Sequence, residues 1–180
     1  MTRLALPLVL ATALLAAAAE NPAVSRDVLA SLEKKLDRTI PALETTDPYD
    51  MLGTARGVYL PGYGAVFTTE LNLIPANYSP FNPLPTGEGI EKLRQRKLAR
   101  LAQLKRSMRV LLVMAAASLE AVPANEQIVL GISLYYKSSE NREGLPSQIV
   151  MQAPRLTLLD LKLERPDSPK LEKAIRVQVL

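Results

Sequence analysis

The spacing of apolar residues divides the chain into helical and extended segments. Near the N-terminus, apolar side chains recur every four residues, which is the spacing of one helix face. They are Val24, Val28, Leu32 and Leu36. Asn21 and Pro22 form a favourable helix start, because asparagine caps a helix and proline fits its first turn. The pattern therefore predicts an N-terminal helix that begins at residues 21–22 and ends at Pro41.

Residues 56–74 show the clearest β-strand pattern. Pro61 and Gly62 suit the central positions of a type II turn, because proline presets the first φ and glycine accepts a positive φ. After the turn, apolar and polar residues alternate, with Phe67 and Leu71 on one face. The pattern predicts an antiparallel hairpin with one half-buried strand. A proline-rich, extended loop is predicted to follow at residues 75–87.

A long helix is predicted at residues 88–121, with Thr86 as its cap. Its second half is apolar on nearly all sides and should be buried. Its first half should protrude or lie against the N-terminal helix, since Arg94 and Lys97 lie on the apolar stripe itself.

Two further strands are predicted at residues 127–137 and 147–153. Beyond Pro154 the run at residues 155–164 fits either a strand or a short helix, and a helix is slightly favoured. Residues 165–169 read as a linker, and the tail that follows fits either structure. The order α–β–β–α–β–β predicts an α+β fold, in which an antiparallel sheet packs against the long helix and the N-terminal helix.

The first 19 residues are predicted to be a signal peptide. Arg3 supplies a basic start, and residues 4–15 form an apolar stretch too short to cross a bilayer as a stable helix. Three alanines at positions 17–19 provide the small residues that signal peptidase recognises. We therefore expect a secreted or periplasmic chain with a single domain at residues 20–180. An uncleaved membrane anchor is the alternative.

Three segments resemble a family of secreted bacterial proteins of unknown function. They are GVYLPGYGAVFTTELNLI at 57–74, EQIVLGISLYY at 126–136 and GLPSQIVMQA at 144–153. The resemblance implies export and a single domain. It implies no activity, cofactor or catalytic residue.

Composition excludes most familiar catalytic chemistries. The 180 residues include no cysteine, no histidine and no tryptophan. This removes the thiolate nucleophile, the Ser–His–Asp triad and the commonest metal ligands. We therefore expect no metal site, no cofactor and no catalytic residue of these classes.

Basic residues are concentrated in the first half of the predicted long helix. Between Lys92 and Arg109 the sequence holds eight basic residues and no acidic residue, against a net charge of +4 for the whole chain. Such a run attracts anions, so anionic lipid, polysaccharide and acidic protein are candidate partners, and nucleic acid is less suitable for an exported chain. The candidate binding residues in this run are Lys92, Arg96, Lys97, Arg100, Arg106 and Arg109. The alternative is a solvated helix whose charges pair within the fold, with Glu33 and Asp37 among the partners.

Aromatic residues are also clustered, since six of the eight lie between positions 49 and 81. Tyr63, Tyr78 and Phe81 are candidate binding residues, because tyrosine combines apolar area with a polar group and suits interfaces. The alternative is that these rings fill the core, with Tyr63 at the turn as the clearest exception.

These features favour a non-enzymatic binding domain for an anionic surface or a protein partner. One alternative is a carboxylate-based hydrolase of cell-envelope polymer, using spaced acid pairs. The pairs are Asp47 with Asp50, Glu140 with Glu143, and Glu164 with Asp167. A second alternative is a structural homo-oligomer, in which long helices pair through Leu101, Leu104 and Met108.

Overall fold

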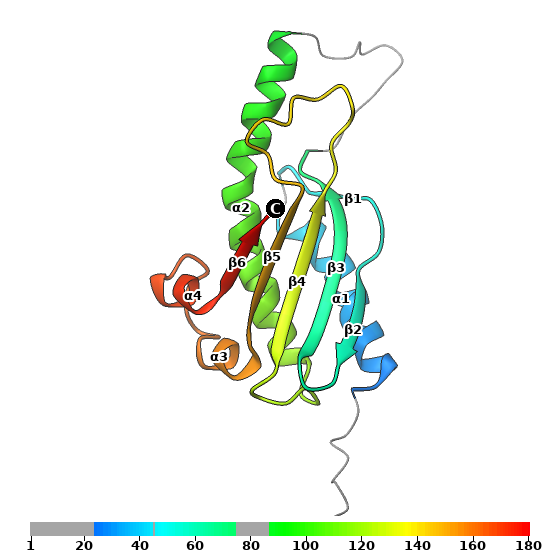
Figure 1. Ribbon diagram of the computed structural model, residues 1–180, viewed down its shortest axis with the longest axis vertical. Coiled ribbons are helices and arrows are strands. Elements are labelled where there is room, and N and C mark those ends of the chain that lie inside the picture. The colour runs from blue at the N-terminus through cyan, green and yellow to red at the C-terminus, as the bar shows by residue number, and fades with distance from the viewer. Residues whose placement is uncertain (1–23, 45, 75–86) are drawn as a thin grey trace, which may run out of the picture.

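The computed structural model describes residues 24–44, 46–74 and 87–180 (Figure 1). The helices are α1 (Arg26–Ala42), α2 (Glu88–Ser118), α3 (Arg155–Asp160) and α4 (Pro169–Ala174). The strands are β1 (Asp50–Met51), β2 (Arg56–Leu60), β3 (Gly64–Asn72), β4 (Gln127–Leu134), β5 (Gln148–Pro154) and β6 (Arg176–Val179). The predicted α+β class, with a sheet, a long helix and an N-terminal helix, is confirmed.

The described strands form one mixed sheet in the order β1-β3-β4-β5-β6, and β2 also pairs with β3. The pairs are antiparallel, as predicted, except that β3 and β4 are parallel. The exception follows from α2, which carries the chain back along the sheet (Figure 1). Because the helix returns the chain to the end where β3 begins, β4 runs in the same direction as β3.

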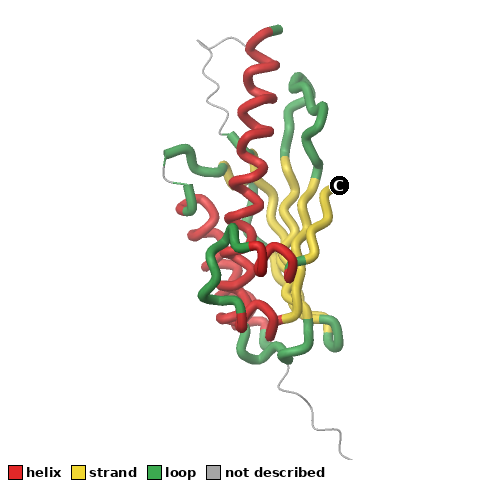
Figure 2. The backbone as a smooth tube through the Cα atoms, turned by 90° about the vertical axis from the view of Figure 1, so that its left-hand side faces the viewer, coloured by secondary structure: helices red, strands yellow, loops and turns green. Residues whose placement is uncertain are grey.

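The molecule has two layers, with the helices on one face of the sheet (Figure 2). No described helix covers the other face. The core lies between the layers and is built from alternate residues of the central strands and the inner faces of α1 and α2. It includes Phe67, Leu71, Ile128, Leu130, Ile132, Ile149, Met151, Leu32, Leu36, Leu104, Met108, Leu111 and Leu112. The alternation predicted for residues 67–71 is confirmed.

The turn between β2 and β3 forms as predicted. The Tyr63 amide donates to the Leu60 carbonyl at 2.9 Å, and Gly62 has a φ of 80°. Gly64, the first residue of β3, has a φ of 140° and pairs with Gln127 of β4. A Cβ atom at Gly64 would lie 1.9 Å from the Gln127 carbonyl oxygen, so this backbone approach requires glycine.

Helix α1 begins later than predicted, because Ser25 supplies its cap. The Ser25 hydroxyl accepts from the Val28 amide at 3.3 Å. The predicted start at residues 21–22 and the predicted cap Thr86 of α2 lie outside the described residues, as does most of the predicted loop 75–87.

The two ambiguous C-terminal segments have different structures. Residues 155–160 form α3, which is the helix that the sequence pattern slightly favoured. The tail contains both α4 and β6. Strand β6 adds to the edge of the sheet by pairing with β5. Within the described ranges, no helix has the length and apolar character needed to cross a membrane.

The first half of α2 extends beyond the ends of the strands, as predicted (Figure 1). It is not free of contacts, because the connection between β4 and β5 lies beside it. Arg94 donates to the Glu143 carbonyl of this connection at 3.0 Å. The basic run therefore meets polar segments of the fold rather than solvent alone.

Candidate functional site

Lys97, one of the predicted binding residues, is a buried structural cation. Its side chain is 1% exposed, and its ammonium lies 2.5 Å from Glu140 Oε2. The same ammonium lies 4.9 Å from the centroid of the Tyr136 ring, a cation–π contact. Glu140 belongs to the connection between β4 and β5, so the pair holds this connection against α2. Burial, followed by the charge of Glu140, raises the pKa of Tyr136 to about 12.

Arg100 is also buried, and it contacts a different segment of the fold from the one that Lys97 contacts. Its guanidinium lies 4.7 Å from the centroid of the Tyr49 ring. Its Nη1 lies 2.5 Å from Asp47 Oδ2, and its Nη2 donates to the Asp47 carbonyl oxygen. Arg96 approaches the same carboxylate at 3.7 Å from an exposed position. Arg100 therefore fixes the connection between α1 and β1.

Arg109 joins α2 to the C-terminal helix. Its Nη2 lies 2.7 Å from Glu172 Oε1, and its Nη1 donates to the Pro166 carbonyl at 3.2 Å. The predicted binding residues thus divide into two groups. Lys97, Arg100 and Arg109 are held within the fold, whereas Lys92, Arg96 and Arg106 are exposed.

The exposed members of the run differ in their partners. Lys92 pairs with Glu88 one turn earlier, at 2.7 Å. Arg106 has no ion-pair partner among the residues that the structure describes. The side chain of Arg106 is therefore free to meet an external anion.

Helix α1 adds exposed cations that the sequence analysis missed. Lys35 donates to the Ser118 hydroxyl at 3.1 Å, and Arg38 donates to the Lys34 carbonyl at 3.2 Å. Within the described part of the chain, no carboxylate pairs with Lys34, Lys35 or Arg38. The available signal was their position on the polar side of the predicted N-terminal stripe. These three residues stand among acidic neighbours, whereas residues 92–109 hold eight basic residues and no acidic residue.

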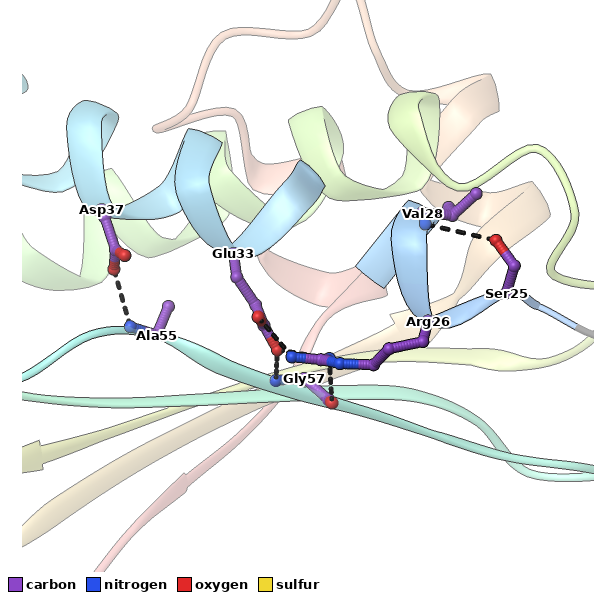
Figure 3. Close-up of polar contacts among 7 residues, drawn as sticks. All are labelled: Ser25, Arg26, Val28, Glu33, Asp37, Ala55 and Gly57. Carbon is purple, nitrogen blue, oxygen red and sulfur yellow. Dashed lines mark hydrogen bonds and ion pairs between the residues drawn. The ribbon is translucent and has the colours of Figure 1, made fainter. Parts of the chain in front are cut away.

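The predicted pairing of the basic run with Glu33 and Asp37 is wrong. Both carboxylates instead turn toward the open edge of β2 (Figure 3). Glu33 accepts from the Gly57 amide at 2.7 Å and binds Arg26 through both oxygens at 2.7 Å, while Asp37 accepts from the Ala55 amide at 2.6 Å. Because unpaired edge amides attract other strands, these contacts also protect the sheet edge.

The hydrogen bonds of Glu33 predict an acid-sensitive contribution to stability. Hydrogen bonds from Arg26 hold the pKa of Glu33 below its ordinary value. Its contribution is therefore full above pH 4.5 and is lost as pH falls through the folded-state pKa. Replacing Glu33→Gln should lower the free energy of unfolding by about 1–3 kcal/mol at neutral pH, measured by urea denaturation.

As pH falls below 4.5, the difference between Glu33→Gln and the unmodified chain should shrink progressively, because the unfolded chain then takes up a proton that the folded carboxylate resists. Glu120→Gln is the matched control, since Glu120 is exposed. A deficit that stays constant across this pH range would contradict the assigned role of the charge.

The predicted aromatic residues have different outcomes. Tyr63 is 43% exposed, and its hydroxyl lies 3.4 Å from Gln152 Oε1. Tyr49 and Phe67 are core residues, as the alternative interpretation stated. Tyr78 and Phe81 lie outside the described residues. Tyr63 is therefore the described aromatic candidate that remains accessible.

At least one acid of each pair considered for hydrolysis binds a cation of the fold. Asp47 and Glu140 bind Arg100 and Lys97, as described above. Hydrogen bonds from Ser168 and Lys170 lower the pKa of Glu164, whereas a general acid requires a raised pKa. In the parts of the chain that the structure describes, no group of three or more acidic side chains could hold a metal ion.

The surface proposed for helix pairing is occupied by the core. Leu104 and Met108 are fully buried, and Leu101 packs against the core. These side chains are therefore unavailable to a second copy.

Comparison with known proteins finds no relative, since no family model, curated protein or solved structure matches the chain. The resemblance of residues 57–74, 126–136 and 144–153 to a secreted bacterial family therefore stays a prediction.

Proposed function

We propose that the protein is an exported, non-enzymatic binding domain whose ligand is an anionic polysaccharide. The observation that carries the proposal is a set of exposed cations on α1 and α2 that lack carboxylate partners among the described residues. They are Lys34, Lys35, Arg38 and Arg106. Export rests on the predicted signal peptide at residues 1–19.

The shape of the helical layer favours an extended ligand. The cations are exposed residues of α1 and α2, so an extended ligand can contact several of them along these helices, whereas a small molecule would need an enclosed pocket. A hollow of about 250 Å³ lies between α1 and α2, lined by Val28, Ser31, Leu32, Lys35 and Ser118. Its hydroxyl and apolar groups suit a sugar ring, while the cations suit acidic groups farther along a polymer.

The proposal is tested with the triple variant Lys34→Ala, Arg38→Ala and Arg106→Ala, using dextran sulfate and polygalacturonate as probes. Arg100 is left unchanged because it is buried. At roughly 0.5–1 kcal/mol per exposed pair, affinity should fall by roughly tenfold or more. The variant should also show a weaker dependence on salt, measured by a binding titration across ionic strengths.

The matched control is Lys162→Ala, Lys173→Ala and Arg176→Ala, which removes the same charge from exposed positions in the C-terminal segment. Equal weakening by both triples would show a net-charge effect and overturn the assigned surface. Tighter binding to polyglutamate than to either polysaccharide would overturn the polysaccharide and favour an acidic protein partner.

A further inference from the structure

The two edges of the sheet differ in how their backbone groups are satisfied. At the β2 edge, the Glu33 carboxylate accepts from the Gly57 amide, so this edge is capped. At the other end of the strand order, β6 pairs with β5 and with no other strand that the structure describes. All four residues of β6 are exposed. This open side of β6, here called the β6 edge, is therefore where a further strand could add.

The β6 edge presents hydrogen-bonding groups at alternate residues. The Leu180 amide donates to the Gln148 carbonyl at 3.0 Å, and the Gln148 amide donates to the Leu180 carbonyl at 3.2 Å. In an antiparallel pair, residues that bond the neighbouring strand alternate with residues whose amides and carbonyls point away from it. Val177 and Val179 therefore direct these groups outward, where no described residue pairs with them. Such a row matches the backbone of an extended chain.

The side chains at the β6 edge favour pairing. Val177 lies opposite Met151 and Val179 lies opposite Ile149, and both of these partners are core residues, so the two valines face the helical layer. They are 38% and 50% exposed and extend the apolar face to the edge of the sheet. Natural edge strands discourage pairing with prolines, inward charges or bulges. Residues 177–179 carry none of these features.

The other face of β6 carries an accessible positive charge. Arg176 lies opposite Gln152, on the face of the sheet that no described helix covers. Its side chain is exposed, and no carboxylate in the described part of the chain pairs with it. Opposite charges on neighbouring strands stabilise strand pairing. An added strand would therefore gain from an acidic residue beside Arg176.

A second copy of the chain fits this edge less well than a peptide does. Two β6 strands paired about a twofold axis would keep both helical layers on the same side of the joined sheet. On that side α2 passes behind β6 (Figure 1), and Arg109 of α2 lies 2.7 Å from Glu172 of α4, just before β6. The helices of both copies would compete for this space, whereas an extended peptide brings no helix.

We propose that the β6 edge binds an extended peptide segment of another protein, which adds to the sheet as a seventh strand. The segment carries apolar side chains at alternate positions, next to Val177 and Val179, and an acidic side chain next to Arg176. Backbone hydrogen bonds supply affinity in this mode of recognition, and the alternate side chains supply selectivity. The β6 edge is separate from the cations proposed to bind polysaccharide.

The test uses a synthetic peptide with the sequence acetyl-Glu-Val-Thr-Val-Thr-Val-Glu-amide. Glutamate at both ends places an acid near Arg176 in either strand direction. The peptide is added to the full chain at up to about 1 mM, and amide hydrogen exchange is followed by NMR. The Val177 and Val179 amides should exchange about fivefold more slowly or better, whereas the Gln178 amide, which already faces β5, should change little. This alternation is specific to strand addition.

Two variants and one modified peptide test the contacts separately. Val179→Pro removes an outward amide and leaves the bonds of the adjacent residues to β5, so peptide affinity should fall by about fivefold or more. Val179→Thr is the matched control, because it keeps the amide and the side-chain shape, and its affinity should change by less than about twofold. Arg176→Glu should weaken binding by about threefold, and replacing both glutamates of the peptide by lysine should restore it. A peptide with N-methylated valines should not bind, because it cannot donate along the edge.

Three outcomes overturn the proposal. One is exchange at Val177 and Val179 that the peptide leaves unchanged, and another is equal binding of the N-methylated peptide. The third is protection of these two amides that rises with protein concentration in the absence of peptide, together with a dimer in sedimentation, which would assign the β6 edge to a second copy. Each of these results leaves the polysaccharide proposal standing, because that titration uses no peptide.

Discussion

Replacing Glu140→Gln is expected to lower the free energy of unfolding by about 3–5 kcal/mol. The side chain of Lys97 is 1% exposed, and its ammonium bonds the Glu140 carboxylate at 2.5 Å. Without that carboxylate the buried ammonium lacks a counter-charge, and the Tyr136 ring compensates for only a fraction of the loss. Urea denaturation followed by circular dichroism measures the change.

The double variant Lys97→Met and Glu140→Leu should recover most of this loss. Apolar side chains of similar volume avoid the desolvation cost of two buried charges. Glu88→Gln is the matched control, because Glu88 pairs with Lys92 in the same helix but both are exposed. The control should cost less than about 1 kcal/mol. If Glu140→Gln costs no more than the control, the pair at Lys97 does not support the connection between β4 and β5.

Replacing Gly64→Ala is expected to cost at least about 3 kcal/mol, because two independent penalties combine. Gly64 has a φ of 140°, which residues with a side chain rarely adopt. The added Cβ would also lie 1.9 Å from the Gln127 carbonyl oxygen and 2.6 Å from its nitrogen. Both atoms belong to backbone at the first register pair of β3 and β4, so relief requires moving a central strand.

Two glycine controls separate these penalties. Gly62→Ala adds a side chain at a φ of 80° in open space, so its cost should be the conformational part alone, about 1–2 kcal/mol. Gly131 has an ordinary φ, and a Cβ atom added there would lie 3.5 Å from its nearest neighbour, in the Thr68 side chain. Gly131→Ala should therefore lower the free energy of unfolding by less than about 1 kcal/mol. Thermal or urea unfolding of the three variants gives the comparison. A cost for Gly64→Ala that equals the cost for Gly62→Ala would show that β4 moves away easily.

Local sequence patterns were sufficient for the main elements. The alternation after Gly62 is a local property of the strand, and the four-residue spacing from Val28 to Leu36 is a local property of the helix. The turn at Pro61 and Gly62 was predictable for the same reason, since both residues act through their own backbone angles. The C-terminal tail was ambiguous because α4 and β6 share one short segment with little periodicity.

The basic run shows where local patterns reach their limit. Sequence identified the cations between Lys92 and Arg109, but it assigned the same role to all of them. Lys97 and Arg100 are internal because distant segments bring partners to α2. Glu140 lies 43 positions from Lys97 and Asp47 lies 53 positions from Arg100. Arg106 meets no such segment among the described residues and stays exposed.

The amino-acid sequence by itself determined the α+β class, the hairpin and its turn, the long helix and the exclusion of cysteine and histidine chemistry. These depend on residue identity and on neighbours within a few positions. Tertiary structure alone decided the parallel pairing of β3 with β4, the capping of the β2 edge by Glu33 and Asp37, and which cations are buried. Each of these depends on contacts between segments far apart in the chain, whose mutual placement follows from packing the helices onto one face of the sheet.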